Sequence, residues 1–289
     1  MFSQFFGDYL LKNQIITSEQ FAACMSYIKA NRVKLGLIAA AEGLLTSSQV
    51  MELNYLQVQS DEKFGDLAVK KGYLTESDVN YLLGLQSNPY LLFVQALDEN
   101  GCLTHDEIDY NITAFQKESN YSNAVMKAIR DGNIEGMLPA FVNVNDQRYL
   151  DLIGLTLRNI VRFISTYIRI APGEFISDHV PKYAAYQNTL GDYQLTLGFT
   201  GEDDDILALA DGYAKEEFGT VDEDALDSIA EFTNCVNGLY AAELSFQNIS
   251  LDMMPPRLTF DEPIDVDGEY YSLPIFVEGK KSHLIVRFN

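Results

Sequence analysis

Residues 222–244 read DEDALDSIAEFTNCVNGLYAAEL, and this stretch decides how the second half of the chain is interpreted. Thr220 and Glu223 have the spacing of a capping box, so we expect a long helix over this range. Side chains on a helix advance by about 100° per residue. Four polar or small residues then fall within an arc of about 60° and predict one polar stripe: Asp227, Glu231, Asn234 and Gly238.

The opposite face of this helix is apolar and carries Ala225, Ile229, Phe232, Val236, Leu239 and Tyr240. Burial of such a face would fix the helix on a sheet, so the polar stripe would face solvent or a partner. Gly238 costs roughly 1 kcal/mol in a helix interior relative to alanine. Close approach of another backbone is one reason to keep it.

The elements around this helix predict an α/β (α+β) fold with a largely antiparallel sheet. Apolar residues recur at helical intervals from Tyr149 to Ile170, and a second helix is expected from Asp203 to about Phe218. Aromatic and β-branched segments predict strands, with a hairpin turn at 278–280. These segments are 183–187, 192–200, 257–264, 270–277 and 282–288.

The first hundred residues contain a repeat whose copies begin 29 residues apart. The copies read G7-DYLLKNQII-T17, G36-LIAAAEGLL-T46 and G65-DLAVKKGYL-T75, and a weaker fourth copy has Val94, Gly101 and Thr104. Each Thr is followed three residues later by a residue that can complete a capping box: Gln20, Gln49, Asp78 and Glu107. Gly43, Gly72 and Gly101 precede the threonines, where a helix end favours glycine. Residues 1–118 are therefore predicted to form an all-α domain of helical repeats.

The repeats resemble the MshEN domain, the amino-terminal module of type II secretion and pilus ATPases, whose motif RLGxxLxxxGxxxxxxLxxxLxxQ recurs at the same period. That family binds cyclic-di-GMP. The resemblance implies nucleotide-binding positions at Lys34, Leu35, Gly36, Gln57, Lys63, Phe64, Gly65 and Gln86. Lysine stands at both arginine positions of the motif, and it cannot stack on guanine or hold it with a bidentate fork. The alternative is a repeat used only for packing or docking, which would need the same glycines and threonines.

Residues 119–144 have mixed polarity and predict a connecting segment, so the second domain is expected to span 145–289. Within it, the polar stripe carries a second resemblance. Asp227, Glu231 and Asn234 are followed 21 and 22 positions after the asparagine by Pro255 and Pro256. This pattern is similar to the signature of the CheC/CheX chemotaxis phosphatases.

The CheC/CheX resemblance implies hydrolysis of the aspartyl phosphate of a CheY-like response regulator. Asn234 would hold the attacking water in line, because phosphoryl transfer needs positioning more than a strong base. Glu231 would accept a bond from the regulator's active-site lysine. Asp227 and Gly238 would border the partner. No cofactor is expected from this chain, since Mg²⁺ comes with the regulator.

The same resemblance implies one site, as in CheX, because the first helix of the domain offers only Thr156-Leu-Arg-Asn159 at the matching place. CheX relatives pair through their sheets, which makes a homodimer the expectation.

The composition narrows the classes of partner. With 42 acidic and 20 basic side chains, the formal net charge is −22, which disfavours nucleic acid and anionic membrane surfaces. No apolar run approaches the roughly 18 residues of a membrane span and no signal peptide is visible, so a cytoplasmic protein is expected.

Cys24, Cys102 and Cys235 are widely spaced, which predicts reduced thiols and no structural metal. The acidic run 202–205 is expected to cap a helix.

Three functions stay open at this point. The first is a phosphatase that ends a two-component signal. The second is a non-catalytic signalling module that binds cyclic-di-GMP or a protein partner. The third is a structural adaptor built on the repeats.

Overall fold

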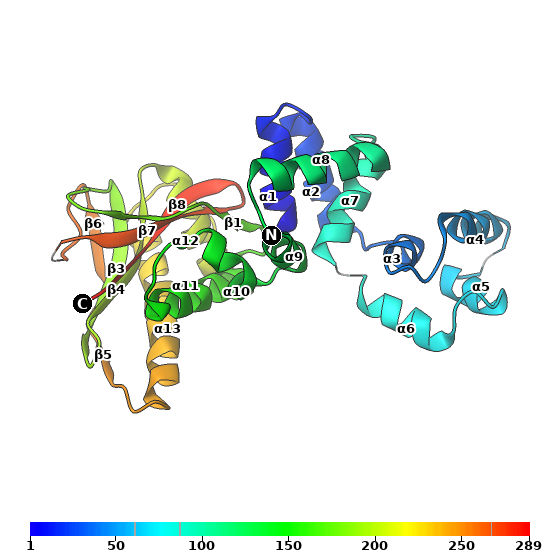
Figure 1. Cartoon of the computed structure of the whole chain (residues 1–289). Coiled ribbons are helices and arrows are strands. Elements are labelled where there is room, and N and C mark those ends of the chain that lie inside the picture. The colour runs from blue at the N-terminus through cyan, green and yellow to red at the C-terminus, as the bar shows by residue number, and fades with distance from the viewer. Residues whose placement is uncertain (61, 87, 267) are drawn as a thin grey trace. The chain divides into compact units, whose positions relative to one another are not determined.

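The computed structural model describes residues 1–60, 62–86, 88–266 and 268–289. These residues form two compact units, drawn in Figure 1. The helical unit comprises Phe2–Asn120 and Arg130–Gly132, and the sheet unit comprises Met1, Tyr121–Ile129 and Asn133–Asn289. Within the described ranges, no helix is both long and apolar enough to span a membrane.

The helical unit contains short and longer helices in alternation. They are α1 (Phe2–Lys12), α2 (Ser18–Ala30), α3 (Leu35–Ala41), α4 (Ser47–Gln59), α5 (Phe64–Lys70), α6 (Glu76–Gly84), α7 (Pro89–Glu99) and α8 (His105–Glu118). The four predicted capping boxes are confirmed: Thr17, Thr46, Thr75 and Thr104 each accept a bond from the backbone of the third helical residue, whose side chain bonds back. The predicted turns are also present, with φ of +70°, +72° and +63° at Gly43, Gly72 and Gly101.

The leading glycine of each of the first three copies allows two helices to pack closely. A Cβ added to Gly36 would lie 2.8 Å from Val50 Cγ1, and one added to Gly65 would lie 2.8 Å from Val79 Cγ1. The same clash, with Phe21, would occur at Gly7. Each glycine faces the side chain of the residue 14 positions later. The same packing of a short helix against the longer helix after it therefore recurs every 29 residues.

The sheet unit is built on antiparallel strands. They are β1 (Ile168–Ile170), β2 (Glu174–Ile176), β3 (Tyr183–Gly191), β4 (Leu195–Gly201), β5 (Leu251–Met253), β6 (Arg257–Phe260), β7 (Tyr270–Val277) and β8 (Lys280–Phe288). The order is β1-β7-β8-β4-β3-β5, with β2 also paired to β7 and β6 to β3. Every described pair is antiparallel, so the predicted sheet type is confirmed.

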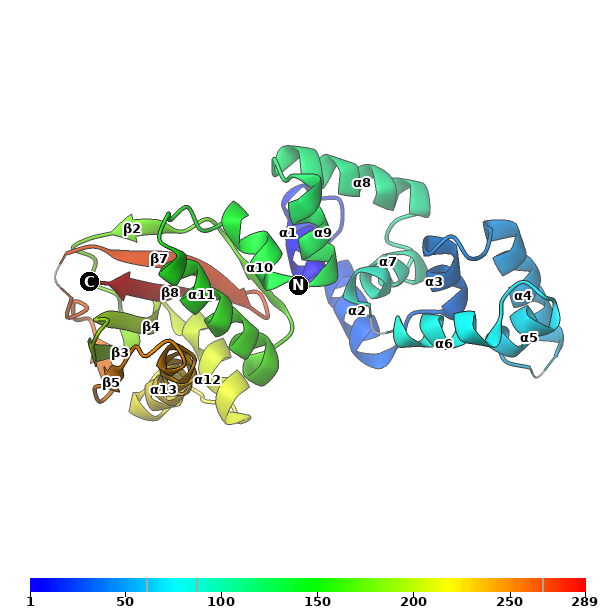
Figure 2. The same ribbon diagram turned by 60° about the horizontal axis from the view of Figure 1, so that its bottom comes forward.

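Two helices pack against this sheet, α11 (Gln147–Asn159) and α13 (Glu223–Ser245), and a third, α12 (Leu207–Ala214), packs against α13. Helix α13 lies along β3 and β4 and also contacts α11 and α12, as Figure 2 shows from a second direction. Its buried face includes Phe232, whose ring centroid is 5.8 Å from that of Phe199 on β4. This packing fixes which face of α13 stays outside.

The helix predicted to reach Ile170 is shorter. Helix α11 ends at Asn159, a π-helical turn follows at Ile160–Ile164, and Ile168–Ile170 form strand β1. Ile168 and Ile170 are buried and pair with β7, while Arg169 between them is partly exposed. Residues 168–170 therefore form a strand on the edge of β7, although the spacing of their apolar side chains also fits a helix.

Two further helix boundaries differ from expectation. The capping box at Thr220 and Glu223 is wrong, because the N-cap of α13 is Asp222, whose carboxylate accepts from Ala225 N at 3.0 Å. An aspartate at this position satisfies a free helix N–H directly. Helix α12 ends at Ala214 rather than Phe218, since Lys215 turns left-handed at φ 61°.

The acidic run caps the segment before α12, as predicted. A short 3-10 helix, Asp204–Ile206, precedes α12, and Asp203 accepts from Asp205 N at 3.0 Å.

The segment 119–144, predicted to be a connection, is largely helical. It contains α9 (Asn123–Asp131), α10 (Ile134–Met137) and a 3-10 turn at Leu138–Ala140. Asn133 caps α10 by accepting from Gly136 N at 3.0 Å. Met126, Ile129 and Met137 are buried, which explains why short helices form where sequence periodicity is weak.

Candidate functional site

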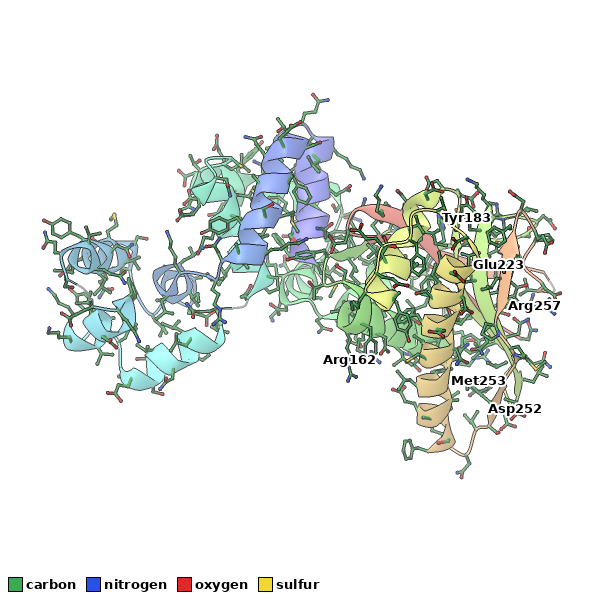
Figure 3. All side chains as sticks on the ribbon, turned by 180° about the vertical axis from the view of Figure 1, so that it is seen from behind. Arg162, Tyr183, Glu223, Asp252, Met253 and Arg257 are labelled. Atoms are coloured by element: carbon green, nitrogen blue, oxygen red, sulfur yellow. The ribbon has the colours of Figure 1, made fainter. Side chains whose placement is uncertain are left out.

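The polar stripe predicted on α13 is present. Asp227, Glu231 and Asn234 are exposed, and Gly238 is partly exposed. Figure 3 shows Glu223 at one end of the helix, with Asp252 and Met253 on the segment that runs beside it. The structure thus brings the four predicted residues to one accessible face, and their roles stay predictions.

A buried glutamine beneath the stripe holds Asn234. Gln187 on β3 donates from Nε2 to Asn234 Oδ1 at 2.8 Å and to the backbone carbonyl of Met254 at 2.8 Å. The other end of its amide, Oε1, accepts from Asn237 Nδ2 at 2.8 Å. Gln187 is 1% exposed and Asn237 is fully buried. Three side-chain amides therefore run in a chain from the sheet to the outer face of α13.

The carbonyl of Met254 determines how these amides are oriented. A backbone carbonyl can only accept, so the Gln187 atom that faces it must be Nε2. The same nitrogen faces Asn234, so the Asn234 atom directed inward must be its oxygen. Among the described residues, Asn234 Nδ2 has no partner, and the second lone pair of Oδ1 is also available. Asn234 consequently presents two donors and one acceptor outward.

Glu231 lies one turn before Asn234 on the same face. It forms neither a hydrogen bond nor an ion pair with the described part of the chain. The neighbouring Tyr213 has a raised pKa, chiefly because of burial and further because of the Cys235 thiol and the Glu231 carboxylate. The carboxylate of Glu231 is thus free to accept a bond from a cationic partner.

Among the described residues, no backbone outside α13 lies within 4 Å of the place that a Cβ of Gly238 would take. A Cβ added there would meet only Met253 Cε, at 4.0 Å. The predicted close approach of a backbone is therefore not made within the described residues. Three apolar side chains in the neighbouring sequence are partly open to solvent: Leu239, Met253 and Met254, with exposed fractions of 40%, 44% and 43%. Leu239 was predicted to be buried, which is wrong: it directly follows Gly238 at the edge of the apolar face, while Tyr240 and Leu244 further along α13 are buried.

Pro255 and Pro256 lie between β5 and β6, two strands that both pair with β3. They directly follow Met254, whose N–H donates to the carbonyl of Asn188 at 3.0 Å and whose carbonyl accepts from Gln187. The prolines are consequently connected to Asn234 through one buried side chain.

The segment at the place of a second site is closed. Thr156 Oγ1 donates to Leu152 O at 2.8 Å, and Asn159 Nδ2 donates to Leu155 O at 2.8 Å. Both side chains are buried, so neither can reach a partner. The sheet unit therefore offers this stripe at one helix only within the described residues.

Sequence reasoning missed Gln187 and Asn237. A signal for Gln187 exists, because it is a polar residue inside the aromatic segment YAAYQ at 183–187, where a strand buries its side chains. Asn237 stands three residues after Asn234, but off the stripe and toward the sheet. Neither signal says which residues the amides will meet.

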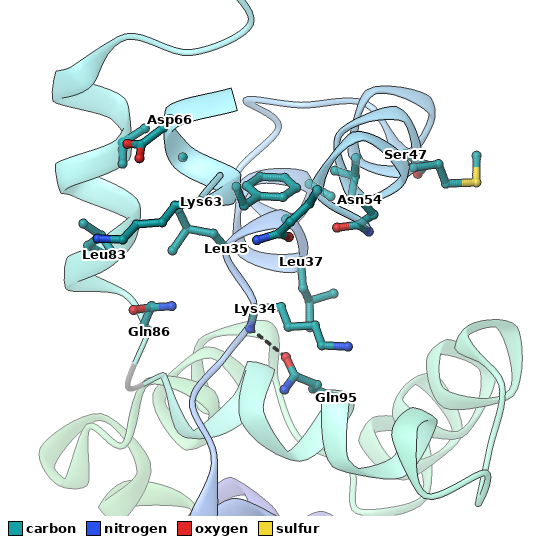
Figure 4. A pocket seen from close by; sticks show the side chains of 18 of the residues that line it. Lys34, Leu35, Leu37, Ser47, Asn54, Lys63, Asp66, Leu83, Gln86 and Gln95 are labelled. Atoms are coloured by element: carbon teal, nitrogen blue, oxygen red, sulfur yellow. Dashed lines mark hydrogen bonds between the residues drawn. The ribbon is translucent and has the colours of Figure 1, made fainter. Parts of the chain in front are cut away.

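The helical unit holds a second candidate site, shown in Figure 4. A cavity of about 1240 Å³ lies among α3, α4, α5 and α6, next to α7. All eight positions predicted from the repeat motif line it: Lys34, Leu35, Gly36, Gln57, Lys63, Phe64, Gly65 and Gln86.

The charges in this cavity do not suit a nucleotide. Lys34 forms an ion pair with Glu99, and this hydrogen bond raises the pKa of Lys34. Gln86 is also engaged, because its Nε2 donates to Val33 O at 3.0 Å. Four carboxylates in the lining outnumber the two lysines: Asp66, Glu76, Asp98 and Glu99. The cavity wall is net negative, which opposes an anionic ligand.

The thiols are free, with Cys24 Sγ 3.8 Å from Cys102 Sγ. Burial, followed by the neighbouring Cys102, raises the pKa of Cys24 to about 12. In the described ranges, no three His, Cys, Asp or Glu side chains gather as a metal site would require.

No family model matches the sequence, and no curated protein matches it either. A CheC-like superfamily protein from Shewanella sp. PV-4 is similar in structure, with 18% identity, 50% of this chain and 99% of that chain covered, and a TM-score of 0.43. The chemotaxis protein CheX from Vibrio vulnificus has 13% identity, 48% and 99% coverage and a TM-score of 0.40. The CheX–CheY–BeF3–Mg²⁺ complex from Borrelia burgdorferi has 14% identity, 48% and 95% coverage and a TM-score of 0.41. The chain is thus similar to solved CheC and CheX structures over about half of its length.

Proposed function

We propose that the sheet unit is a phosphatase that hydrolyses the aspartyl phosphate of a CheY-like response regulator in chemotaxis or two-component signalling. The observation that carries this proposal is the exposed stripe of α13. Glu231 and Asn234 stand one turn apart on it, and the Asn234 amide is held from behind by Gln187. The signature of Asp227, Glu231, Asn234 and the later prolines supports the same assignment.

Asn234 acts by positioning water. A phosphoryl group in transfer has a loose transition state, so an aligned water contributes more than a strong base. The free lone pair of Asn234 Oδ1 accepts a proton of that water, and Nδ2 donates to its oxygen or to a phosphoryl oxygen. A neutral amide suffices for both tasks.

Glu231 acts by holding the partner. Its unpaired carboxylate accepts a charge-assisted bond from the regulator's active-site lysine, which fixes the two proteins in register. Asp227 and the open space over Gly238 border this contact. Mg²⁺ belongs to the regulator, and this chain contributes no cofactor.

The test follows loss of aspartyl phosphate from a phosphorylated CheY-like regulator of the same cell. We expect the chain to accelerate this loss and Asn234→Ala to reduce the acceleration by about 100-fold. Glu231→Ala is expected to raise KM by about tenfold or more, because a hydrogen bond to a charged group is lost. Glu243→Ala removes an exposed glutamate from another face of the same helix and should change neither. No acceleration with any cognate regulator would refute the phosphatase.

The alternative is a non-catalytic signalling module whose ligand occupies the cavity of the helical unit. Convergence of the eight motif positions on one cavity favours a ligand there. The acidic lining, together with Met51 and Val58 exposed on α4, favours a basic and apolar protein segment over cyclic-di-GMP. Calorimetric titration with cyclic-di-GMP separates the two. Saturable heat that Lys63→Ala abolishes would establish nucleotide binding, whereas its absence would leave protein docking. The homodimer stays a prediction, which light scattering would test.

A further inference from the structure

We infer that Gln187 is a positioning residue for Asn234, the inner member of a buried amide relay that fixes which atoms Asn234 presents to the regulator. This inference rests on the proposed phosphatase function. It concerns a residue of β3 that lies outside the helix and outside the signature of Asp227, Glu231, Asn234 and the prolines.

The relay has only one consistent direction. It begins at the carbonyl of Met254, which forces Nε2 of Gln187 to face both that carbonyl and Asn234. Oε1 of Gln187 then points to Asn237, which supplies its Nδ2 at 2.8 Å. Reversal of any one amide would place two donors or two acceptors face to face, which costs free energy in a buried site.

Asn234 needs such support because it is exposed. An asparagine on a helix surface can rotate about its side-chain bonds and exchange the positions of its nitrogen and oxygen. Only some of these arrangements align a water with the phosphoryl group. The bond to Gln187 selects one of them before the regulator arrives, so less ordering is left for the reaction.

The relay also gives the distant prolines a physical role. A residue that precedes proline is restricted to extended conformations, and Met254 precedes Pro255. Met254 continues the pairing of β5 with β3 through its N–H to Asn188. The extended conformation of Met254 thereby keeps its carbonyl within hydrogen-bonding distance of Gln187 Nε2. In this way, the proline contributes to the orientation of Asn234 without touching it.

Gln187→Leu removes the relay at its centre. We expect kcat to fall by about tenfold or more while KM for the phosphorylated regulator stays within about twofold, because Glu231 and the docking surface remain. In the Asn234→Ala background, Gln187→Leu should have no further effect on kcat, since it acts through Asn234. Additive losses would overturn the inference.

Gln187→Glu provides a readout that a structural role would not move. The introduced carboxyl can donate to Asn234 only when it is protonated, and burial raises its pKa. Its kcat relative to wild type should therefore be highest near pH 5 and fall as the carboxyl ionises toward about pH 8. A ratio that does not depend on pH, in a variant that circular dichroism shows to be folded throughout, would count against the relay.

Thr196→Val is the matched control for lost packing. It removes a part-buried side-chain hydrogen bond between β4 and β3, from Thr196 Oγ1 to Asn188 Oδ1 at 2.7 Å, and leaves the side chains of Gln187 and Asn234 in place. It should lower stability and keep kcat. A loss of kcat equal to that of Gln187→Leu would show that any damage to β3 has this effect.

A measurement without the regulator separates this inference from the proposed function. The side-chain amide of Asn234 should give a rigid ¹⁵N relaxation signature in the wild-type chain and a mobile one in Gln187→Leu. If the wild type shows this rigidity but no phosphatase activity, the relay stands and the proposed function fails. Equal mobility in both proteins would refute the relay even if the phosphatase is active.

Discussion

At the residue scale, a substitution at Gly238 is expected to stabilise the fold and to weaken binding of the regulator. It lies inside α13, where alanine forms helix more readily, and a Cβ would meet only Met253 Cε at 4.0 Å. We expect Gly238→Ala to raise the free energy of unfolding by roughly 1 kcal/mol, measured by urea denaturation. The same methyl group would stand in the docking surface, so KM for the phosphorylated regulator should rise.

Gly84→Ala is the control for this substitution. Gly84 is the last residue of α6 in the helical unit and likewise has open space around it, so its replacement should leave KM unchanged. If Gly238→Ala stabilises the chain with an unaltered KM, the regulator does not dock over Gly238.

A second residue, His283 on β8, predicts a dependence of stability on pH. Its Nδ1 lies 2.9 Å from Ser272 Oγ, and burial, followed by the charge of Lys281, lowers its pKa below the ordinary 6.5. The unfolded chain therefore binds this proton more readily. The stability due to His283 is complete above about pH 6.5 and is lost as the pH falls through the lower folded-state pKa.

His283→Asn should reduce the fall in unfolding free energy that accompanies a fall in pH. Between about pH 7 and pH 5, urea denaturation is expected to show a smaller decrease in unfolding free energy for the variant than for the wild type. His105→Asn, which replaces an exposed histidine of the helical unit, should leave the pH profile of the sheet unit as it is. A variant profile that parallels the wild type would contradict the assigned role.

At the scale of elements, the packing of α5 against α6 depends on a glycine. A Cβ at position 65 would lie 2.8 Å from Val79 Cγ1, and a β-branched side chain has little freedom to move away. Gly65→Ala is expected to lower the free energy of unfolding of the helical unit by about 1–3 kcal/mol. Adding Val79→Ala should recover part of this loss in thermal denaturation. Failure of the second substitution to recover stability would mean that the glycine serves something other than packing.

Elements defined by local chemistry could be predicted from the sequence. A threonine three residues before Gln49 or Asp78 carries its own capping partner, and the helical period alone places Glu231 and Asn234 on one face. Strand β1 could not be predicted, because Ile168–Ile170 become a strand only through pairing with β7. Gln187 escaped for a similar reason: its contact with Asn234 joins residues 47 positions apart and exists only after α13 has packed on β3.

At the scale of the whole molecule, the two units divide the candidate functions between them. The stripe, Gln187, Asn237 and Met254 all belong to the sheet unit. We therefore expect a fragment of residues 119–289 to retain the kcat of the full chain within about twofold, in the same phosphate-release assay. A folded fragment with no activity would show that the helical unit takes part in the reaction. If the full chain is also inactive, binding of the phosphorylated regulator by the fragment and by the full chain would be compared instead.

The two-residue turn between β7 and β8 has a consequence for the folding kinetics. Glu278 and Gly279 both have positive φ, at 52° and 84°, which matches the right-handed twist of the strands they join. This hairpin can form within about 1–10 μs. By contrast, β8 reaches β4 through pairs such as Thr200 with His283, which close a long loop. We therefore expect the joining of β3 and β4 to this hairpin to be slower than formation of the hairpin itself.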